Sequence, residues 1–145
     1  MRVLFLDVDG VLNRTGFQPD ESLGLRSWIE PELAERLCDV LRATRAQVVM
    51  SSDWRLEREL DALRDELRAA GIDAALIGAT PELAGQPRWR EIEAWMVEHQ
   101  VDREAVVIVD DGHDMGKLTE RFVRTSPLNG LDEQAARAVV ALFEA

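Results

Sequence analysis

Short, continuous apolar runs alternate with longer amphipathic stretches along most of the chain. The runs are rich in valine, isoleucine and leucine, which is typical of strands buried on both faces of a parallel sheet. Three runs show this clearly, at residues 3–6, 47–50 and 105–109, and two weaker strand candidates lie at residues 74–77 and 122–125. The pattern therefore predicts five strands.

Between the predicted strands, apolar side chains recur every three or four residues, which indicates amphipathic helices that pack one face on a sheet. The second of these helices is expected over residues 53–70, where Ser52 would be the N-cap residue. The recurring positions are Leu33, Leu37, Val40 and Leu41, then Leu56, Leu60, Leu63 and Leu67, then Ile92, Trp95, Met96 and His99, then Ala136, Val139, Val140 and Phe143.

This alternation of strands and helices predicts a three-layer, Rossmann-like α/β fold, with a parallel five-stranded sheet and helices on both faces. In such sheets, ligands bind beyond the carboxyl ends of the strands. With 145 residues and 46% apolar content, residues 1–145 are expected to form a single domain. Residues 13–27 and 80–87 lack periodicity and contain glycine and proline, so both are expected to be loops near the functional edge.

Composition and charge exclude some classes of partner. The formal net charge is −11, which repels extended polyanions, so long nucleic acid is not expected as a partner. The single Cys38 lies in a helical stretch and has no internal disulfide partner, which favours packing in a reducing compartment. The first apolar run ends at Asp7, too early for a secretory signal, and no later run approaches a membrane span. We therefore expect a cytoplasmic protein with no membrane partner.

The residues with the clearest chemical meaning follow the first strand. Asp7 and Asp9 stand at its end, and Gly10 follows them. A carboxylate in the middle of a buried strand would be costly, but at the strand end it can face a ligand, while glycine lets the backbone turn away sharply. This segment therefore predicts a site built on two carboxylates.

A second group of acids follows the strand at residues 105–109, namely Asp110 and Asp111, with Asp114 close behind. Parallel strands would bring these acids to the edge that carries Asp7. Like charges at that separation raise one another's pKa, and a divalent cation with oxygen ligands is the usual remedy. A site of few carboxylates that also binds phosphate suits Mg²⁺ better than Ca²⁺, so we predict Mg²⁺.

The strand at residues 47–50 ends in Ser51 and Ser52, which are followed by Asp53. Their hydroxyls and the amino end of the next helix would lie at the same edge of the sheet. That combination suits the oxygens of a phosphate group.

Four segments, in this order, resemble the four motifs of haloacid-dehalogenase-like (HAD) phosphatases: LFLDVDGVLN, VVMSSDWR, PRWREIEAWM and VIVDD. The resemblance spans nearly the whole chain and rests on four ordered motifs rather than on a lone DxD. More narrowly, DVDGVLN, SSDWR and the closing FVRTSPLNGL resemble the HAD domain of Swiss-Army-knife RNA repair proteins. The resemblance implies a Mg²⁺-dependent phosphatase that acts through an aspartyl-phosphate intermediate.

The resemblance also implies roles for the acids. Asp7 would be the nucleophile that accepts the phosphoryl group, and Asp9 the general acid and base. Mg²⁺ would be held by the Asp7 carboxylate, the backbone carbonyl of Asp9 and the Asp111 carboxylate, with Asp110 or Asp114 left to position waters. The choice between Asp110 and Asp111 as the last ligand stays open.

Two further roles follow from the same resemblance. Ser52 fits the hydroxyl that binds the transferring phosphoryl group, because Ser51 could still belong to the strand, and Ser51 is the alternative. The third motif needs a cation to offset charge on the nucleophile and the phosphoryl group. Arg88 matches that cation by its spacing within the helix start, and Arg90 is the alternative.

Substrate choice in HAD enzymes usually depends on cap insertions, and neither residues 13–29 nor residues 55–87 are long enough for a large cap. The open site would suit a phosphate on a large molecule, such as a nucleic-acid end or a phosphoprotein, or a small substrate enclosed by a partner chain. Trp28, in the first of these segments, is expected to meet the substrate. A terminal phosphate would need only the site and a few cations, for which the candidates are Arg14, Arg26, Arg55 and Arg88.

Two rival functions use the same fold. One is a non-catalytic phosphate-binding or regulatory module, and the other is a phosphotransferase, which these residues do not separate from a phosphatase. A signalling receiver domain is also phosphorylated on aspartate, but it carries its acidic pair after the first strand and its acceptor after a later one. Because the order here is the reverse, a receiver is not expected.

Overall fold

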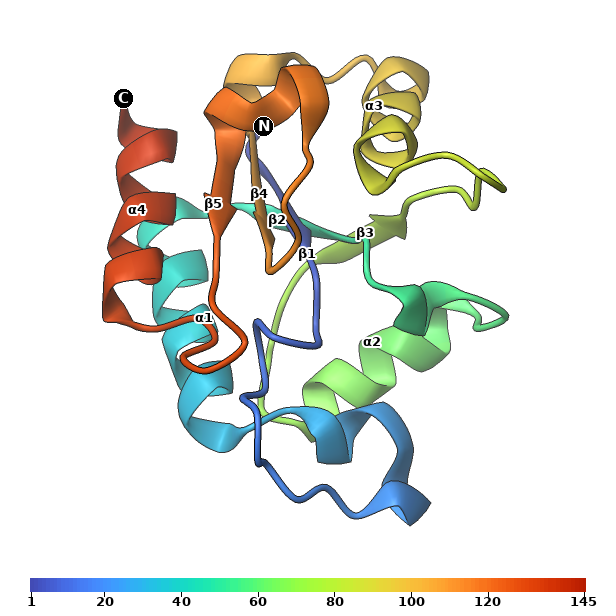
Figure 1. The fold of residues 1–145 in the computed structure, drawn as a ribbon, viewed down its shortest axis with the longest axis vertical. Coiled ribbons are helices and arrows are strands. Elements are labelled where there is room, and N and C mark those ends of the chain that lie inside the picture. The colour runs from blue at the N-terminus through green and yellow to red at the C-terminus, as the bar shows by residue number, and fades with distance from the viewer.

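The chain folds around a parallel sheet of five strands. The computed structural model describes residues 1–145, with every side chain except that of Glu21. The strands lie in the order β3-β2-β1-β4-β5, and each neighbouring pair is parallel, which confirms the predicted sheet (Figure 1). Their bounds are β1 (Val3–Leu6), β2 (Gln47–Met50), β3 (Leu76–Ala79), β4 (Val106–Asp110) and β5 (Phe122–Arg124).

Helices cover both faces of this sheet, as the sequence predicts. Leu4 and Leu6 of β1 pack in one hydrophobic cluster with three helices, whereas Val3 and Phe5, which alternate with them, pack in a second cluster with the remaining helix. Figure 1 shows α1 and α4 side by side on one flank and α3 on the other. The first cluster contains residues of α1 (Pro31–Thr44), α2 (Leu60–Ala69) and α4 (Glu133–Glu144), and the second contains residues of α3 (Arg88–His99).

The register of the three central strands places their carboxyl ends level with one another. Leu6 of β1 lies opposite Met50 of β2 and Val109 of β4. The ladders continue one step further, because the Asp7 N–H donates to the Val109 carbonyl at 3.2 Å and the Ser51 N–H donates to the Leu6 carbonyl at 3.0 Å. The residues that follow each strand therefore start from the same edge.

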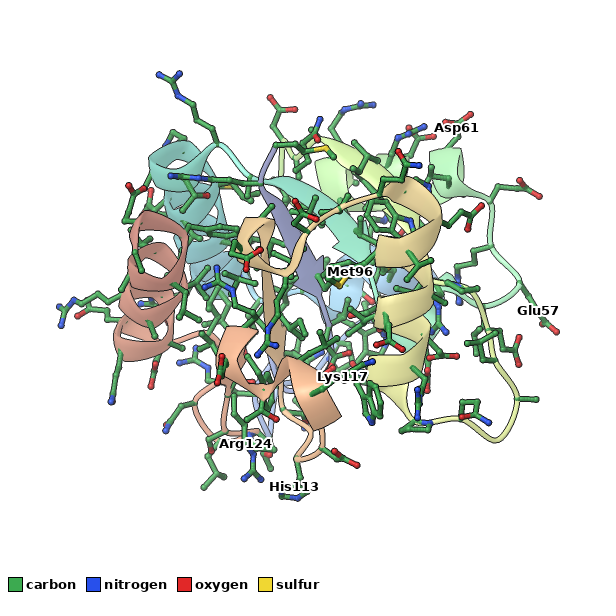
Figure 2. The ribbon with its side chains drawn as sticks, turned by 90° about the horizontal axis from the view of Figure 1, so that it is seen from above. Glu57, Asp61, Met96, His113, Lys117 and Arg124 are labelled. Carbon is green, nitrogen blue, oxygen red and sulfur yellow. The ribbon has the colours of Figure 1, made fainter. Side chains whose placement is uncertain are left out.

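The prediction of one helix over residues 53–70 is wrong in its first part. A short 3-10 turn, η2 (Asp53–Arg55), follows Ser52, whose hydroxyl accepts a hydrogen bond from the Trp54 N–H at 3.2 Å. Glu57 then adopts a left-handed φ of 59°, and α2 begins only at Leu60. Figure 2 shows Glu57 at the outer margin of the molecule, in the loop between η2 and α2. Leucine spacing alone did not reveal this break.

Two other boundaries differ from the predictions. The strand expected at residues 74–77 is β3 at Leu76–Ala79. Its pairing with β2 shifts register between Val48 and Val49, and a Cβ at Gly78 would stand 3.0 Å from Trp95 Nε1. Residues 13–27, expected to be irregular, run into the 3-10 segment η1 (Glu21–Trp28), which Gly24 interrupts with a φ of 72°. The remaining 3-10 segments, η3 (Arg103–Ala105) and η4 (Gly116–Arg121), lie on either side of β4 in the sequence.

No helix among the described residues combines the length and the apolar character that a membrane span would need.

The first core cluster should dominate stability. Leu37 of α1 is fully buried, so Leu37→Ala is expected to lower the free energy of unfolding by about 2–5 kcal/mol, through lost burial and the cavity left behind. Val97→Ala on α3, where the side chain is 73% exposed, should change it by less than about 0.5 kcal/mol. Urea unfolding of both variants measures the difference, and equal losses would contradict this assignment of the core.

Candidate functional site

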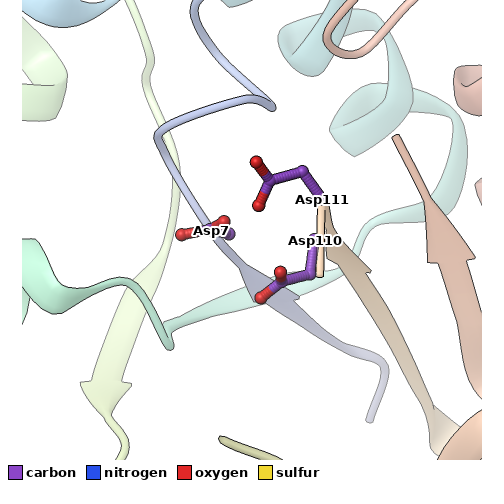
Figure 3. Close-up of side chains that lie close together, drawn as sticks. All are labelled: Asp7, Asp110 and Asp111. Atoms are coloured by element: carbon purple, nitrogen blue, oxygen red, sulfur yellow. The ribbon is translucent and has the colours of Figure 1, made fainter. Parts of the chain in front are cut away.

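Three carboxylates from two strand ends meet beyond the sheet. Asp7 follows β1, Asp110 ends β4 and Asp111 comes next, and one carboxylate oxygen from each lies within 4.8 Å of the others (Figure 3). The Asp7 and Asp110 residues are 4% and 2% exposed, and Asp111 is half-buried. The structure thus brings Asp7 of the first motif together with Asp110 and Asp111 of the fourth, and we call these three residues the acid cluster.

Hydrogen bonds distinguish the two neighbouring acids of β4. Asp110 is engaged through both oxygens, since Oδ1 accepts from the Gly112 N–H at 2.7 Å and Oδ2 from Arg88 Nη1 at 2.7 Å. Within the described part of the chain, no hydrogen bond to the Asp111 carboxylate is formed. Asp114 lies outside the acid cluster, is exposed and accepts from the Gly116 N–H at 2.9 Å. Asp111 is therefore the acid with the most free oxygen lone pairs.

Arg88, at the first turn of α3, is the cation that reaches the acid cluster. Its Nη1 lies 2.7 Å from Asp110 Oδ2 and 3.2 Å from Asp7 Oδ1, and its Nη2 lies 3.3 Å from Asp53 Oδ1. Arg90 instead packs over the Trp89 ring, 4.2 Å from its centroid, and points away to another acid on α3. Of the two arginines left open by the sequence, the structure brings Arg88 to the site.

Burial and charge strongly perturb Asp7. Burial, together with the negative charge of Asp110, raises the pKa of Asp7 from 3.8 to about 8, although Arg88 and the Val8 N–H act in the opposite direction. Burial alone would lower the pKa of Arg88, but the charges of Asp110 and Asp7 outweigh it and keep the guanidinium protonated. The single positive charge of Arg88 thus does not balance the negative charge of all three acids in the cluster.

The donor set of the acid cluster fits a hard divalent cation. It consists of carboxylate oxygens, which Mg²⁺ prefers, and a cation there would favour the ionised form of Asp7 that burial disfavours. The half-buried Asp111, with no hydrogen bond from the described residues, has oxygens free for such an ion. Mg²⁺ binding by Asp7 and Asp111 is compatible with this arrangement.

Asp9 lies beside this cluster but outside it, and its side chain is exposed. Its Oδ1 accepts a hydrogen bond from Asn13 Nδ2 at 2.9 Å and a longer one from Trp54 Nε1 at 3.5 Å. Asn13 was missed by sequence reasoning, although it is the last residue of the DVDGVLN segment. The only signal in the sequence is an asparagine six residues after the first acid of the motif; its burial, at 9% exposure, is visible only in the structure.

Gly10 makes room for the acid cluster. Its φ is +80°, and a Cβ at this position would stand 2.2 Å from Asp111 Oδ2. Its carbonyl accepts a hydrogen bond from the Thr125 hydroxyl at 2.7 Å, which connects the closing segment of the chain to the turn after β1. Thr125 is a second residue whose contact could not be seen in the sequence, because 115 positions separate it from Gly10.

The two candidate serines are both buried at the end of β2, with 0% and 1% exposure. Ser52 caps η2, and because its oxygen accepts from the Trp54 N–H, its own proton is free to be donated. The Ser51 hydroxyl finds no hydrogen-bond partner among the described residues. Alternation along β2 places Ser51 on the same face of the sheet as Asp7. Both hydroxyls thus stay candidates for a phosphate oxygen.

Arg55, expected to help grip a terminal phosphate, is not free to do so. It is 6% exposed, and its Nη2 lies 3.0 Å from Glu91 Oε2. Its guanidinium also donates to backbone carbonyls at the ends of β2 and β3, namely those of Ser51, Ser52, Thr80 and Pro81. The expectation for Arg55 is therefore corrected: it holds the loops that surround the site.

The remaining candidate contacts, Arg14, Arg26 and Trp28, and the neighbouring His113 have the following surroundings. Arg14 is held by Glu30 at 2.8 Å and Glu32 at 3.0 Å, and Arg26 is exposed on η1. His113 is exposed in the loop after β4, where its Nε2 lies 3.3 Å from Arg124 Nη2; Figure 2 shows both at the rim of the molecule. Trp28, the expected substrate contact, packs at a tilt on Trp54 with 6.2 Å between ring centroids.

Comparison with known families gives one match. The family model described as "HAD domain in Swiss Army Knife RNA repair proteins" matches residues 3–136, from the start of β1 into α4. Among curated proteins no significant match was found.

The raised pKa of Asp7 predicts how stability responds to pH in metal-free solution. Between pH 3.8 and about 8, the folded state holds a proton that the unfolded state has lost, so stability falls as pH rises. Asp7→Asn cannot ionise, and its free energy of unfolding should therefore gain on the wild type, by at most about 1.4 kcal/mol per pH unit. Urea unfolding in EDTA across this range measures the gap. A gap that stays constant with pH would show that Asp7 ionises normally.

Proposed function

Since the chain belongs to the family of HAD domains in Swiss Army Knife RNA repair proteins, we propose that residues 1–145 form a single hydrolase domain that acts as a Mg²⁺-dependent phosphatase. The family supports a phosphohydrolase-type activity in general. The observation that carries the finer proposal is the buried Asp7, which lies within reach of two further carboxylates and of Arg88.

In the first step, an Asp7 carboxylate oxygen attacks phosphorus in line with the leaving group, and an aspartyl-phosphate forms. The bond between phosphorus and the leaving oxygen breaks, and Asp9 transfers its proton to that oxygen. Arg88 offsets negative charge on the nucleophile and on the phosphoryl oxygens, and Ser52, or alternatively Ser51, donates a hydrogen bond to the latter. The burial of Asp7 supports its role as the nucleophile, and the exposure of Asp9 supports its role as the proton donor.

In the second step, Asp9 is a carboxylate and accepts a proton from water, whose oxygen attacks the same phosphorus. The bond between phosphorus and the Asp7 oxygen breaks, which releases inorganic phosphate and regenerates both aspartates. The net reaction converts a phosphomonoester and water to an alcohol and phosphate. If an alcohol replaced water in this step, the same residues would perform phosphotransfer.

The candidate ligands of Mg²⁺ are the carboxylates of Asp7 and Asp111 and the backbone carbonyl of Asp9. When bound, the cation supplies positive charge that neutralises the nucleophile and the phosphoryl group together. Arg88 alone does not supply enough charge, since Asp7 keeps its raised pKa beside it.

The substrate we propose carries its phosphate at the end of a large molecule, such as a nucleic-acid end. Among the described residues no inserted domain large enough for a cap is present, and Asp9 is exposed. A terminal phosphate needs contact only with the site itself, so it is compatible with a net charge of −11 that disfavours extended nucleic acid. The single, half-buried Cys38 is compatible with a reducing, cytoplasmic setting.

The first test is turnover. With Mg²⁺, the wild type should release phosphate steadily from p-nitrophenyl phosphate, and EDTA should stop it. Asp7→Asn should lower kcat by at least about a thousandfold, because it removes the nucleophile. Asp73→Asn, at an exposed acid outside the acid cluster, is the matched control and should keep full activity.

Phosphate binding without turnover by the wild type would favour a non-catalytic module and contradict this proposal. The same assay on oligonucleotides that carry a 3′ or a 5′ phosphate would define the substrate class.

A second test compares the two neighbouring arginines. Arg88→Gln should lower kcat/KM about a hundredfold, because it removes the cation that touches Asp7 and Asp110. Arg90→Gln, which removes only a surface contact with Glu93 and the Trp89 ring, should change it by less than about threefold. Steady-state kinetics on one substrate decide between them, and a greater loss in Arg90→Gln would reverse the assignment.

A further inference from the structure

The exposed Asp9 carboxylate is held by the described residues through only one of its two oxygens. Both of its side-chain hydrogen bonds reach the same oxygen, Oδ1, from Asn13 Nδ2 at 2.9 Å and from Trp54 Nε1 at 3.5 Å. The donors come from different parts of the chain, since Asn13 follows β1 and Trp54 lies in η2. Within the described residues, Oδ2 receives neither donor. An exposed aspartate without such donors would rotate freely about its side-chain bonds.

Asn13 is itself fixed in place. It is 9% exposed, its Oδ1 accepts from the Gly10 N–H at 3.0 Å, and its Nδ2 donates to the Trp28 carbonyl at 2.9 Å as well as to Asp9. Rotating the amide by half a turn would set its oxygen against two acceptors and its NH₂ against an N–H, so only one orientation satisfies all three partners. Asn13 therefore presents an N–H to Asp9 in a fixed direction.

These contacts decide which oxygen of Asp9 can carry a proton. An oxygen that accepts from two N–H donors cannot also point a proton at them, so protonated Asp9 would hold its proton on Oδ2. From this geometry, and resting on the phosphatase function proposed above, we infer that Asn13 is a positioning residue that directs Oδ2 of Asp9 toward the leaving oxygen. Trp54 assists as the second donor to Oδ1, and Asn13 also couples Asp9 to the backbone of η1 through the Trp28 carbonyl.

A purely structural role for Asn13 makes a different prediction. If Asn13 only stabilised the turn after β1, its loss would slow all substrates alike. If it positions the proton donor, its loss should matter most for leaving groups that need protonation and least for those that leave as stable anions. The dependence of rate on the leaving group separates these two roles.

The experiment measures kcat/KM with Mg²⁺ for a series of phosphomonoesters, from p-nitrophenyl phosphate through phenyl phosphate to an alkyl phosphate. Asn13→Ala should lower kcat/KM about tenfold to a hundredfold for the alkyl and phenyl esters, but less than about threefold for p-nitrophenyl phosphate. Inhibition by inorganic phosphate should stay unchanged. Asn129→Ala, at the exposed asparagine of the loop after β5, is the matched control and should leave the whole series unchanged.

Trp54→Phe provides a second, milder variant, because it removes the indole N–H and keeps an aromatic ring against Trp28. It should shift the series in the same direction by a smaller factor, and it decides the matter if Asn13→Ala does not fold. An equal loss across the series, or no loss with the alkyl ester, would overturn the role of Asn13 while leaving the phosphatase in place. A wild type that hydrolyses none of the esters would overturn the proposed function itself, and this inference with it.

Discussion

Repulsion between carboxylates in a poorly solvated space is the constraint on which this site depends. The central strands end level with one another, so Asp7 and Asp110 come together while both are almost fully buried. Burial and mutual repulsion disfavour ionisation, and the pKa of Asp7 rises accordingly. Arg88 compensates part of that charge, and a divalent cation would compensate more. The nucleophilic role proposed for Asp7 requires its ionised form, and that form depends on compensating positive charge such as that of Arg88.

The neighbouring loops are built to support this arrangement. Arg55 collects backbone carbonyls from the ends of β2 and β3 and pairs with Glu91, only one turn of α3 away from Arg88. This buried pair therefore joins the first turn of α3, which carries Arg88, to the ends of β2 and β3. On the other side, Gly10 leaves space for Asp111, and Thr125 holds the turn after β1. Loss of the Arg55–Glu91 pair, or of the Thr125 hydrogen bond, would let charged groups at the site shift. At such short separations, small shifts change the interaction energy between charges.

The two aspartates of the first motif occupy contrasting environments, and the contrast suits different chemistry. Asp7 is buried among charges, whereas Asp9, two residues further, is exposed and held by neutral donors from Asn13 and Trp54. A nucleophile needs a fixed position and compensating charge, and a proton donor needs access to water and to the leaving group. The open surroundings of Asp9 are also consistent with a substrate that extends far beyond its phosphate.

Residue order alone was enough to predict the parallel sheet, four helices and the strand ends at which the acids stand, because apolar periodicity and strand-end motifs are local properties of the chain. It also indicated the HAD family through four ordered motifs. Four further features became visible in the folded chain: Arg88 rather than Arg90 meets the acids, Arg55 is a structural residue, Asn13 holds Asp9, and the chain breaks at Glu57 before α2. The positions of Arg88 and Arg55 depend on charged partners far apart in the chain, which neither spacing nor composition specifies. Asn13 lies only four residues from Asp9 and Glu57 breaks the chain locally, but apolar periodicity does not record a single side-chain hydrogen bond or a single left-handed residue.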